Sequence, residues 1–252
     1  MSRADRTHRF YAEDLSGQEL ALSAGEAHHA LRVLRLKEGA EVELFDGRGR
    51  RARGRIAQAG RDALVVEIGQ RPQPAERPGP LVHLAFAVPK GRRLDWLLEK
   101  ATELGAASLR PVFFERSVAG RRRTPGHGGF TQAKRGRWLA HCISAAKQCG
   151  LDFLPEIAPP ARLADFLRAP QEGVRLVGHA GPEAQTVMDA LAGWRAARPV
   201  WLLVGPEGGL TQPEIAAAGR SGFRPVRLGR TTLRVETAAV ALLAAVVAAV
   251  GA

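Results

Sequence analysis

Apolar and polar positions alternate with a short period in the first part of the chain. Between Val42 and Ile68 the sequence reads as three short strands (VELF, RARGRIAQ and ALVVEI), and the pair Asp46-Gly47 after the first is a hairpin signal. A single helix is expected at residues 25–36. This pattern predicts a small β-barrel with one helix.

A run rich in proline, Gln70–Pro80, separates this region from the rest. It has four prolines in eleven residues and is typical of a linker, so we expect a boundary near residue 75. Beyond it, strands and helices alternate, which predicts a mostly parallel sheet covered by helices on both faces. We therefore expect two domains, 1–75 and 76–252. The strands are expected at 81–88, 108–114, 174–179, 201–204 and 225–228, and the helices at 93–104, 136–150, 186–197 and from about residue 232 onward.

The stretch Trp201–Ile215 (WLLVGPEGGLTQPEI) is a short apolar run that stops in a glycine-rich turn and restarts as a helix. Four apolar residues in a row fit a strand buried on both faces. The three glycines between residues 205 and 209 have no Cβ, so a flat ligand could lie against main-chain amides. Thr211 and Glu214 form a capping-box signal for the next helix. The stretch predicts a ligand site, although glycine turns also connect strands to helices where no ligand binds.

A second turn of the same kind follows in residues 223–239 (FRPVRLGRTTLRVETAA). It reads as a strand at Pro225–Leu228, a turn at Gly229 and a helix that opens near Thr232. Two such turns can form opposite walls of one pocket, which favours a ligand site over a purely structural turn.

The formal net charge is +12, with a sequence pI near 11.1, and the excess lies in the second half. Residues 79–252 hold 23 Lys and Arg against 13 Asp and Glu, whereas residues 1–78 hold 14 against 12. Nine basic residues between Arg110 and Lys147 face one acid, and residues 48–61 add six arginines with no acid. Arginine suits phosphate contacts and stacking on unpaired bases. The alternative is a set of solvated loops in an arginine-rich sequence, but such clustering favours a nucleic acid over that alternative and over a membrane surface.

The two cysteines, Cys142 and Cys149, are seven apart on an expected helix, too far for a disulfide and without neighbours for a zinc site. We expect buried reduced thiols, a cytoplasmic protein, no metal and, since the N-terminus lacks an apolar stretch, no secretion signal. Residues 237–252 carry no charge but are too few to cross a membrane. A helix that is apolar on all sides should be buried, partly in its own domain and partly against a partner subunit.

The two turns, GPEGG and then LGRTTLRVETA, resemble the C-terminal signature of the RsmE family, methyltransferases of the SPOUT superfamily that act on ribosomal RNA. The resemblance covers nearly the whole chain and implies an α/β fold: a SPOUT-type parallel sheet with a C-terminal trefoil knot, preceded by a PUA-like RNA-binding β-barrel. It also implies S-adenosylmethionine as the cofactor, held by the knot, and a homodimer. Further segments in the family's order are His8–Phe10, His28–Gly49, Val88–Gly105, Phe113–Val118 and Ser144–Gly150.

The resemblance implies methyl transfer to N3 of a uridine in 16S ribosomal RNA of the small subunit. That nitrogen carries a proton at neutral pH, so a base must remove it and a cation must hold the charge left on the uracil oxygens. Arg234 is the candidate cation, and Glu236 or Glu207 the candidate base; alternatively, Glu207 satisfies turn amides and Glu236 caps the last helix. The positions that match the family's cofactor site are Leu203, Gly205, Pro206, Glu207, Gly208, Gly209, Leu228, Gly229, Leu233, Arg234 and Thr237.

One departure from the family concerns the RNA. After SAAKQCG, where the family has an arginine, this chain has Leu151 and Asp152, and Arg137 or Lys147 could replace that arginine. His179 follows an expected strand and is either a structural imidazole or part of the pocket. The residues expected to contact RNA are Arg9, Arg32, Arg35, Arg48, Arg50, Arg116, Arg121, Arg122, Arg123, Arg137 and Lys147.

Two other functions compete with base methylation. Other SPOUT proteins methylate the ribose 2'-oxygen, but these relatives have an asparagine-containing motif that VPKGRRLDW lacks. The other competitor is a ribosome-assembly protein that binds RNA without catalysis, which would bind RNA with a steep salt dependence and bind no cofactor.

Overall fold

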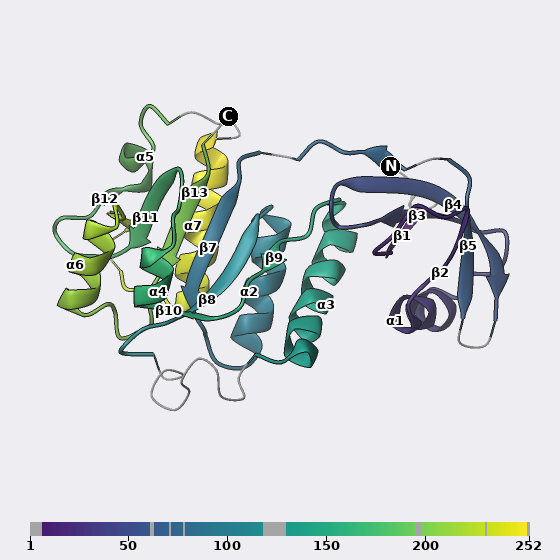
Figure 1. The fold of residues 1–252 in the computed structure, drawn as a ribbon, viewed down its shortest axis with the longest axis horizontal. Coiled ribbons are helices and arrows are strands. Elements are labelled where there is room, and N and C mark those ends of the chain that lie inside the picture. Colours follow the sequence, from purple (N-terminus) through teal and green to yellow (C-terminus); the bar gives the residue numbers. More distant parts are fainter. Residues whose placement is uncertain are drawn as a thin grey trace. The chain divides into compact units, whose positions relative to one another are not determined.

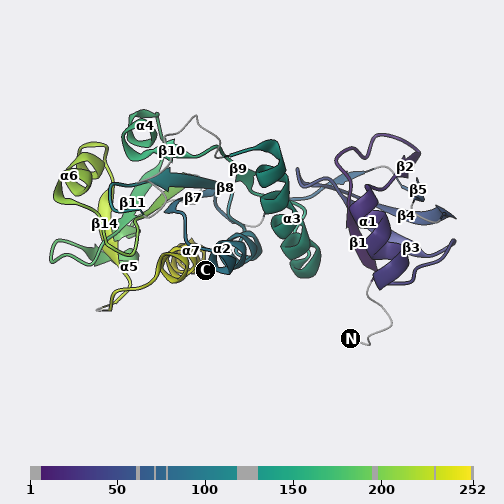
Figure 2. The ribbon, with the colours of Figure 1, turned by 90° about the horizontal axis from the view of Figure 1, so that it is seen from below.

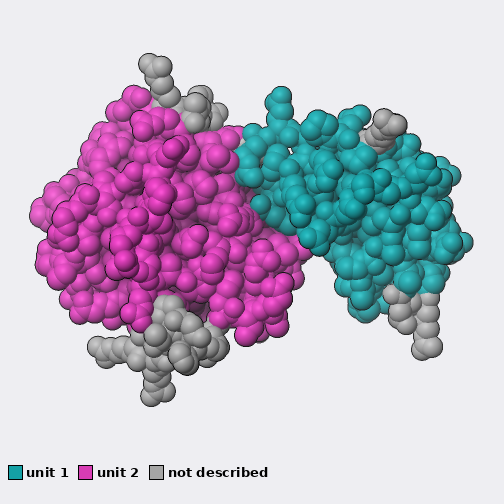
Figure 3. Space-filling view, viewed as in Figure 1, with its two compact units in different colours: residues 1–77, 146–154 teal, residues 78–145, 155–252 magenta. Residues whose placement is uncertain are grey.

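The computed structural model describes residues 7–60, 63–70, 72–77, 79–117, 130–194, 198–229 and 231–250. Contacts along the chain divide it into two compact units, which Figure 3 shows in different colours. Unit 1 comprises Met1–Arg77 and Ala146–Leu154, and unit 2 comprises Pro78–Ala145 and Pro155–Ala252. The second segment of unit 1 lies far beyond residue 75, where the sequence suggested a boundary.

Unit 1 is built on a six-stranded sheet in the order β1-β3-β4-β5-β2, with β6 beside β4 (Figure 1). Strands β1 and β3 are parallel, and the other pairs are antiparallel. The small β domain expected from the sequence is confirmed. Its elements are β1 (His8–Tyr11), β2 (Glu19–Ala21), α1 (Ala24–His28), the π-helix η2 (His29–Val33), β3 (Glu41–Phe45), β4 (Arg50–Ala59), β5 (Leu64–Ile68) and β6 (Gln73–Pro74).

Strand β4 shows how the alternating pattern builds this sheet. Ala52, Gly54 and Ile56 are buried, whereas the arginines between them are exposed, as the twofold period of a strand requires. A Cβ on Gly54 would lie 2.5 Å from the carbonyl oxygen of Glu67, so glycine lets β5 approach closely. The predicted hairpin between β3 and β4 is confirmed.

The single helix expected at residues 25–36 is shorter and irregular. The α-helical part ends at His28, and one π-helical stretch continues to Val33. Arg35 then has φ of 54°, a left-handed conformation that ends any helix. The prediction of one regular helix to Leu36 was therefore wrong at its C-terminal end.

The segment Ala146–Leu154 packs on the hairpin turn of unit 1. Gly49 donates its N–H to Asp152 O at 3.0 Å, and Leu154 donates to Gly47 O at 2.8 Å. A Cβ on Gly49 would lie 2.2 Å from Phe153, and one on Gly47 would lie 2.6 Å from Leu154. Both glycines also have positive φ, 70° at Gly47 and 93° at Gly49, so the turn needs glycine for its shape and for this packing.

Unit 2 is built on an eight-stranded sheet in the order β10-β8-β7-β13-β11-β14-β12, with β9 beside β8, and all its strand pairs are parallel. Figure 2 shows α2 and α7 on one face and α4 and α6 on the other, which confirms the parallel, doubly covered sheet. Its elements are β7 (Val82–Ala87), α2 (Arg92–Glu103), β8 (Ser108–Phe113), α3 (Gln132–Cys149), β9 (Glu156–Ile157), β10 (Ala161–Arg162), α4 (Leu163–Arg168), β11 (Val174–Gly178), β12 (Gln185–Thr186), α5 (Val187–Ala190), β13 (Val200–Val204), α6 (Gln212–Arg220), β14 (Arg224–Arg227) and α7 (Val235–Val250).

Helix α2 follows its sequence pattern closely. Leu94, Leu97, Leu98 and Ala101 lie on one face and are buried, as the helical period predicts. Gly105, with φ of 75°, follows the helix and stops it.

Two helices of unit 2 differ from expectation. The helix expected at 186–197 is only α5, which ends at Ala190, because the chain turns there and Gly193 has φ of 73°. Helix α4 was not expected, because six residues are too few to show a helical period.

Helix α7 has one fully buried face and one face of small residues. Val235, Ala239, Leu242, Leu243 and Val246 are buried, and the helix packs on β7, β13, α2 and α5. Most of its remaining residues are only partly buried. None of the helices in the described ranges is both long enough and apolar enough to span a bilayer.

The two cysteines do not form a disulfide, as expected. Cys142 is buried, and its burial raises the pKa of the thiol to about 11. Cys149, by contrast, is exposed, so the expectation that both thiols are buried was wrong for this residue. It is the last residue of α3.

Candidate functional site

The carboxyl ends of three neighbouring strands meet at one edge of the sheet in unit 2. Strand β11 lies between β13 and β14, and Gly178 at its end pairs with Val204 on one side and Val226 on the other. Because the strands are parallel, the loops that follow all leave from the same edge, which is where α/β sheets bind their ligands.

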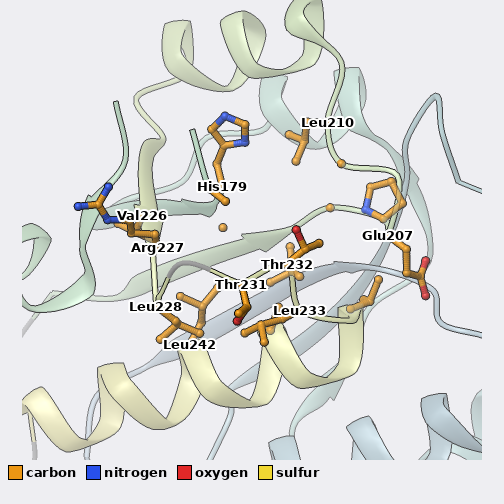
Figure 4. A pocket seen from close by; sticks show the side chains of 18 of the residues that line it. His179, Glu207, Leu210, Val226, Arg227, Leu228, Thr231, Thr232, Leu233 and Leu242 are labelled. Carbon is orange, nitrogen blue, oxygen red and sulfur yellow. The ribbon is translucent and has the colours of Figure 1, made fainter. Parts of the chain in front are cut away.

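These loops and the start of α7 enclose a cavity of about 340 Å³. Figure 4 shows Leu228, Leu233 and Leu242 on one side of it and His179 and Leu210 on the other. The lining residues are Gly178, His179, Ala180, Val204, Gly205, Pro206, Glu207, Gly208, Gly209, Leu210, Val226, Arg227, Leu228, Gly229, Thr231, Thr232, Leu233, Val235, Ala238 and Leu242.

The turn after β13 is shaped by its glycines. Gly209 donates its N–H to Pro206 O at 2.8 Å and has φ of 70°, a conformation that side chains other than glycine rarely adopt. A Cβ on Gly205 would lie 2.4 Å from Cδ1 of Leu210. At both positions glycine keeps the backbone open toward the cavity, and Thr211 with Glu214 forms the predicted capping box that starts α6.

The opposite wall includes His179, directly after β11. Its backbone N–H donates to Val226 O at 2.9 Å, and its Nε2 lies 3.0 Å from Oε1 of Glu183. The imidazole is therefore held by a carboxylate and also lines the cavity, so the two interpretations left open for His179 both apply.

Most of the residues matched to the family's cofactor site lie together. Gly205, Pro206, Glu207, Gly208, Gly209, Leu228, Gly229 and Leu233 line the cavity, but Leu203, Arg234 and Thr237 do not. His179 was considered as part of the pocket, but its neighbours Gly178 and Ala180 and the α7 residues Ala238 and Leu242 were missed. Gly178 lies near the end of an expected strand, so the rule that sites gather at the carboxyl ends of strands could have identified it.

The three candidate catalytic residues have different surroundings. Glu207 lines the cavity, but its carboxylate points away from it (Figure 4). Glu236 is buried in the first turn of α7, where Oε1 lies 3.6 Å from Nε of Arg93. Arg234 is exposed and comes directly before α7, and its carbonyl oxygen accepts the N–H of Ala238 at 2.8 Å.

Several residues expected to contact RNA are engaged inside unit 1. Arg9 has only 11% of its side chain exposed; Nε lies 2.7 Å from Oε1 of Glu43, Nη2 is bonded to Asp152, and the guanidinium stacks on Phe45. Lys147 is bonded to the carboxylate of Glu26 at 2.8 Å. These two side chains therefore hold unit 1 together, whatever else they bind.

The remaining RNA candidates lie at the surface. Arg50 lies 2.7 Å from Asp46 and Arg48 lies 3.5 Å from Glu13. Arg32, Arg35 and Arg137 are exposed. Arg116 is exposed and donates to a backbone carbonyl of unit 2. Arg121, Arg122 and Arg123 lie outside the described residues.

Comparison with known protein families shows what the chain is similar to. Residues 76–247 match the family described as RNA methyltransferase domain, and residues 22–69 match the family described as RNA methyltransferase PUA domain. The two matches lie in the expected order, and the first covers every strand and loop that builds the cavity.

Individual relatives agree with this result. The ribosomal RNA small subunit methyltransferase E of Mycobacterium bovis is 34% identical over 245 residues, which cover 94% of this chain and 90% of the relative. The protein of the same name from Synechocystis is 30% identical over 236 residues, which cover 92% of this chain and 74% of the relative.

Two solved structures have the same fold. A methyltransferase from Legionella pneumophila in complex with the cofactor SAM has a TM-score of 0.82 at 32% identity and covers 97% of this chain and 98% of its own. The ribosomal RNA small subunit methyltransferase E from Neisseria gonorrhoeae, bound to S-adenosyl methionine, has a TM-score of 0.80 at 30% identity, with 95% and 96% covered.

Proposed function

The chain belongs to the family of ribosomal RNA small subunit methyltransferase E, and from this membership we propose that it methylates N3 of one uridine in 16S ribosomal RNA. It is an S-adenosylmethionine-dependent rRNA methyltransferase with a PUA domain. The observation that carries the proposal is the cavity at the carboxyl edge of the sheet, which lies within the residues 76–247 that match the RNA methyltransferase domain.

The residues around the cavity fit S-adenosylmethionine. Its volume, about 340 Å³, is within the usual range for small-molecule sites. Glycine-rich backbone on one wall suits a flat adenine, and the leucines on the other suit its apolar faces. The proposed cofactor-binding positions that do not line the cavity, Leu203, Arg234 and Thr237, flank residues that do. When bound, S-adenosylmethionine supplies an activated methyl group on its sulfonium.

The chain's own residues have to position the uracil and take its proton. We assign to Arg234 the task of stabilising negative charge on the uracil oxygens, since it is exposed just before α7. The candidates for the base are Glu207 and Glu236. Glu207 must turn toward the cavity to act, and Glu236 would have to exchange its contact with Arg93 for one with the substrate.

The reaction type and the modified nucleobase are tested by mass spectrometry of ribosomal RNA nucleosides from cells with and without the gene. Loss of 3-methyluridine alone is the expected result. Loss of a nucleotide that resists alkaline cleavage would indicate ribose 2'-O-methylation instead, and an unchanged profile would support a protein that only binds RNA.

Cofactor binding and the role of Arg234 are tested on the purified protein. Calorimetry should show association of S-adenosylhomocysteine with the wild type and with Arg234→Ala, whereas Arg234→Ala should lose methyl transfer. Equal losses of binding and transfer would contradict the assigned role. Loss of methyl transfer in one of the variants Glu207→Gln and Glu236→Gln, but not in the other, would identify the general base.

The assembly is part of the same proposal. We infer a homodimer, a knotted C-terminal segment and a cytoplasmic site of action beside the rRNA. The half-buried face of α7, which is almost entirely alanine and valine, supports the dimer, because an apolar helix face is normally covered. Sedimentation equilibrium should give twice the chain mass of 27.0 kDa; a monomer would contradict the inference.

A further inference from the structure

The loop that follows β8, Phe114–Ser117, contacts the glycine turn of the cavity from outside. Nη1 of Arg116 donates to the carbonyl oxygen of Gly208 at 2.8 Å. The backbone N–H of Glu115 donates to Oε1 of Glu214 at 2.8 Å, and Oε2 of the same carboxylate accepts the N–H of Thr211 at 2.8 Å.

These bonds hold the turn at two places. Gly208 lines the cavity, and Thr211 directly follows Leu210, another lining residue. A Cβ on Gly208 would lie 3.5 Å from Cβ and Cδ of Arg116, so the arginine stem packs along the turn as well as bonding to it. The shape of the turn therefore depends on side chains that do not line the cavity.

The loop Phe114–Ser117 is itself fixed by burial and by internal hydrogen bonds. Ser117 is buried, and its hydroxyl accepts the N–H of Phe114 at 3.1 Å while its own N–H donates to Phe114 O at 3.1 Å. Phe114 is also buried. A binding turn keeps its geometry when its neighbours are themselves fixed by packing and hydrogen bonds.

We propose that Arg116 and Glu214 are positioning residues for the cofactor, which set the geometry of the turn between Gly205 and Leu210 without touching the ligand. The inference rests on the proposed function, since it takes the cavity as the S-adenosylmethionine site. It assigns Arg116, which the sequence suggested for RNA, a role on the cofactor side. Glu214 acts as more than a helix cap, because its second oxygen reaches the loop after β8.

The test is calorimetric titration of S-adenosylhomocysteine into full-length wild type, Arg116→Ala, Arg116→Lys and Glu214→Gln, without RNA. Arg116→Ala and Glu214→Gln should bind about five- to tenfold more weakly, as expected for loss of one hydrogen bond of ordinary strength. Arg116→Lys should recover part of the affinity, because an ammonium can still donate to Gly208 O. Steady-state assays should show a raised KM for S-adenosylmethionine with kcat little changed.

Matched controls keep the test specific. Arg220→Ala removes an exposed arginine at the other end of α6, and Glu156→Gln neutralises an exposed carboxylate on β9; both should bind like the wild type. If Glu214→Gln lowers the thermal midpoint by weakening the start of α6, Arg116→Ala decides, since it leaves that cap intact.

The possible outcomes distinguish failure of this inference from failure of the proposed function. Wild-type affinity in both Arg116→Ala and Glu214→Gln would overturn the inference while leaving the cofactor site in place. Absence of binding by the folded wild type would instead refute the proposed function. In the double variant, a loss smaller than the product of the single losses is expected, because both side chains act through one loop.

Discussion

The cavity of unit 2 and the hairpin region of unit 1 are built from opposite kinds of residue. Of the twenty described residues that line the cavity, five have polar or charged side chains. Around the turn between β3 and β4, by contrast, charged contacts are dense: Arg9 and Arg51 contact Asp152, and Arg50 contacts Asp46. The geometry of the cavity depends on backbone conformation, whereas that of the hairpin region depends on ion pairs. A high arginine content in a protein that acts on RNA therefore includes arginines that serve the fold.

The largest effect should come from the buried pair of Arg9 and Asp152. These side chains are 11% and 8% exposed, and removal of Arg9 leaves the buried Asp152 carboxylate with a weaker, half-exposed contact to Arg51 at 3.9 Å. Arg9→Ala should lower the stability of unit 1 by about 3–5 kcal/mol. Hydrogen exchange followed by mass spectrometry should show lost protection in peptides from β1 and β3, with peptides of unit 2 unchanged.

Arg55→Ala is the matched control for Arg9→Ala. Its partner is Glu41 at 3.9 Å, and the two side chains are 65% and 79% exposed, so the pair contributes less than about 1 kcal/mol. Equal loss of protection in the two variants would show that burial of the charged pair is not what stabilises unit 1.

The second effect concerns the apolar region. Gly205→Val should weaken S-adenosylhomocysteine binding roughly 10- to 100-fold, because the new side chain would displace Leu210 into the cavity. Exchange in unit 1 should not change. Gly219→Ala in α6 has open space around its Cβ and should bind normally with equal or higher stability. Normal binding by Gly205→Val would show that the turn does not need glycine there.

The same contrast explains what the sequence could and could not predict. The cavity was largely predictable, because it depends on local strand-turn-helix patterns at Gly205 and Gly229 and on the rule that parallel strands end at one edge. The contact between Arg9 and Asp152 joins residues 143 apart, and no local pattern pairs them. Asp152 was noted only as a departure from the family, yet it is the partner that holds Arg9.

Cross-strand register is a second reason why the sequence alone did not show which arginines are free to bind RNA. Residues 48–61 contain six arginines and no acid, but in the sheet Glu43 lies opposite Arg53, and Glu41 opposite Arg55. The acids that offset part of this charge come from β3, so a count along the chain overestimates how much free positive charge the strand presents. Arg110 and Arg135 keep their charge, but each donates a hydrogen bond to a backbone carbonyl of the fold.

The third effect is a pH dependence in the hairpin turn. Burial opposes ionisation of Asp46, but hydrogen bonds from the Arg50 side chain and from the N–H groups of Arg50 and Arg48 outweigh it and lower the pKa of the carboxyl. A carboxyl whose pKa is lower in the folded state stabilises the fold above its unfolded pKa, and this contribution is lost as the pH falls through the folded value.

Asp46→Asn should therefore cost about 1–2 kcal/mol at pH 7, with the difference from wild type shrinking below about pH 4. Thermal unfolding at pH 7, 5 and 3 would measure it. Glu41→Gln, which alters an exposed carboxylate on the same sheet, should show no such dependence. A constant difference at all three values would mean that Asp46 acts through packing rather than through its charge.

The smallest effect separates arginines that face solvent from those that hold the fold. Arg32 is exposed in the π-helix η2, whereas Arg50 is bonded to the buried carboxylate of Asp46 at 2.7 Å. Each was expected to contact RNA.

Arg32→Ala should weaken binding of 16S ribosomal RNA about threefold to tenfold and reduce the slope of log affinity against log salt by about 1, as loss of one phosphate contact does. Arg50→Ala should mainly lower stability and leave that slope nearly unchanged, because its guanidinium is already neutralised by an internal partner. Fluorescence anisotropy with the rRNA at several salt concentrations measures both slopes. Equal reductions would show that the bond to Asp46 does not withhold Arg50 from the RNA, and the division between structural and RNA-facing arginines in unit 1 would have to be abandoned.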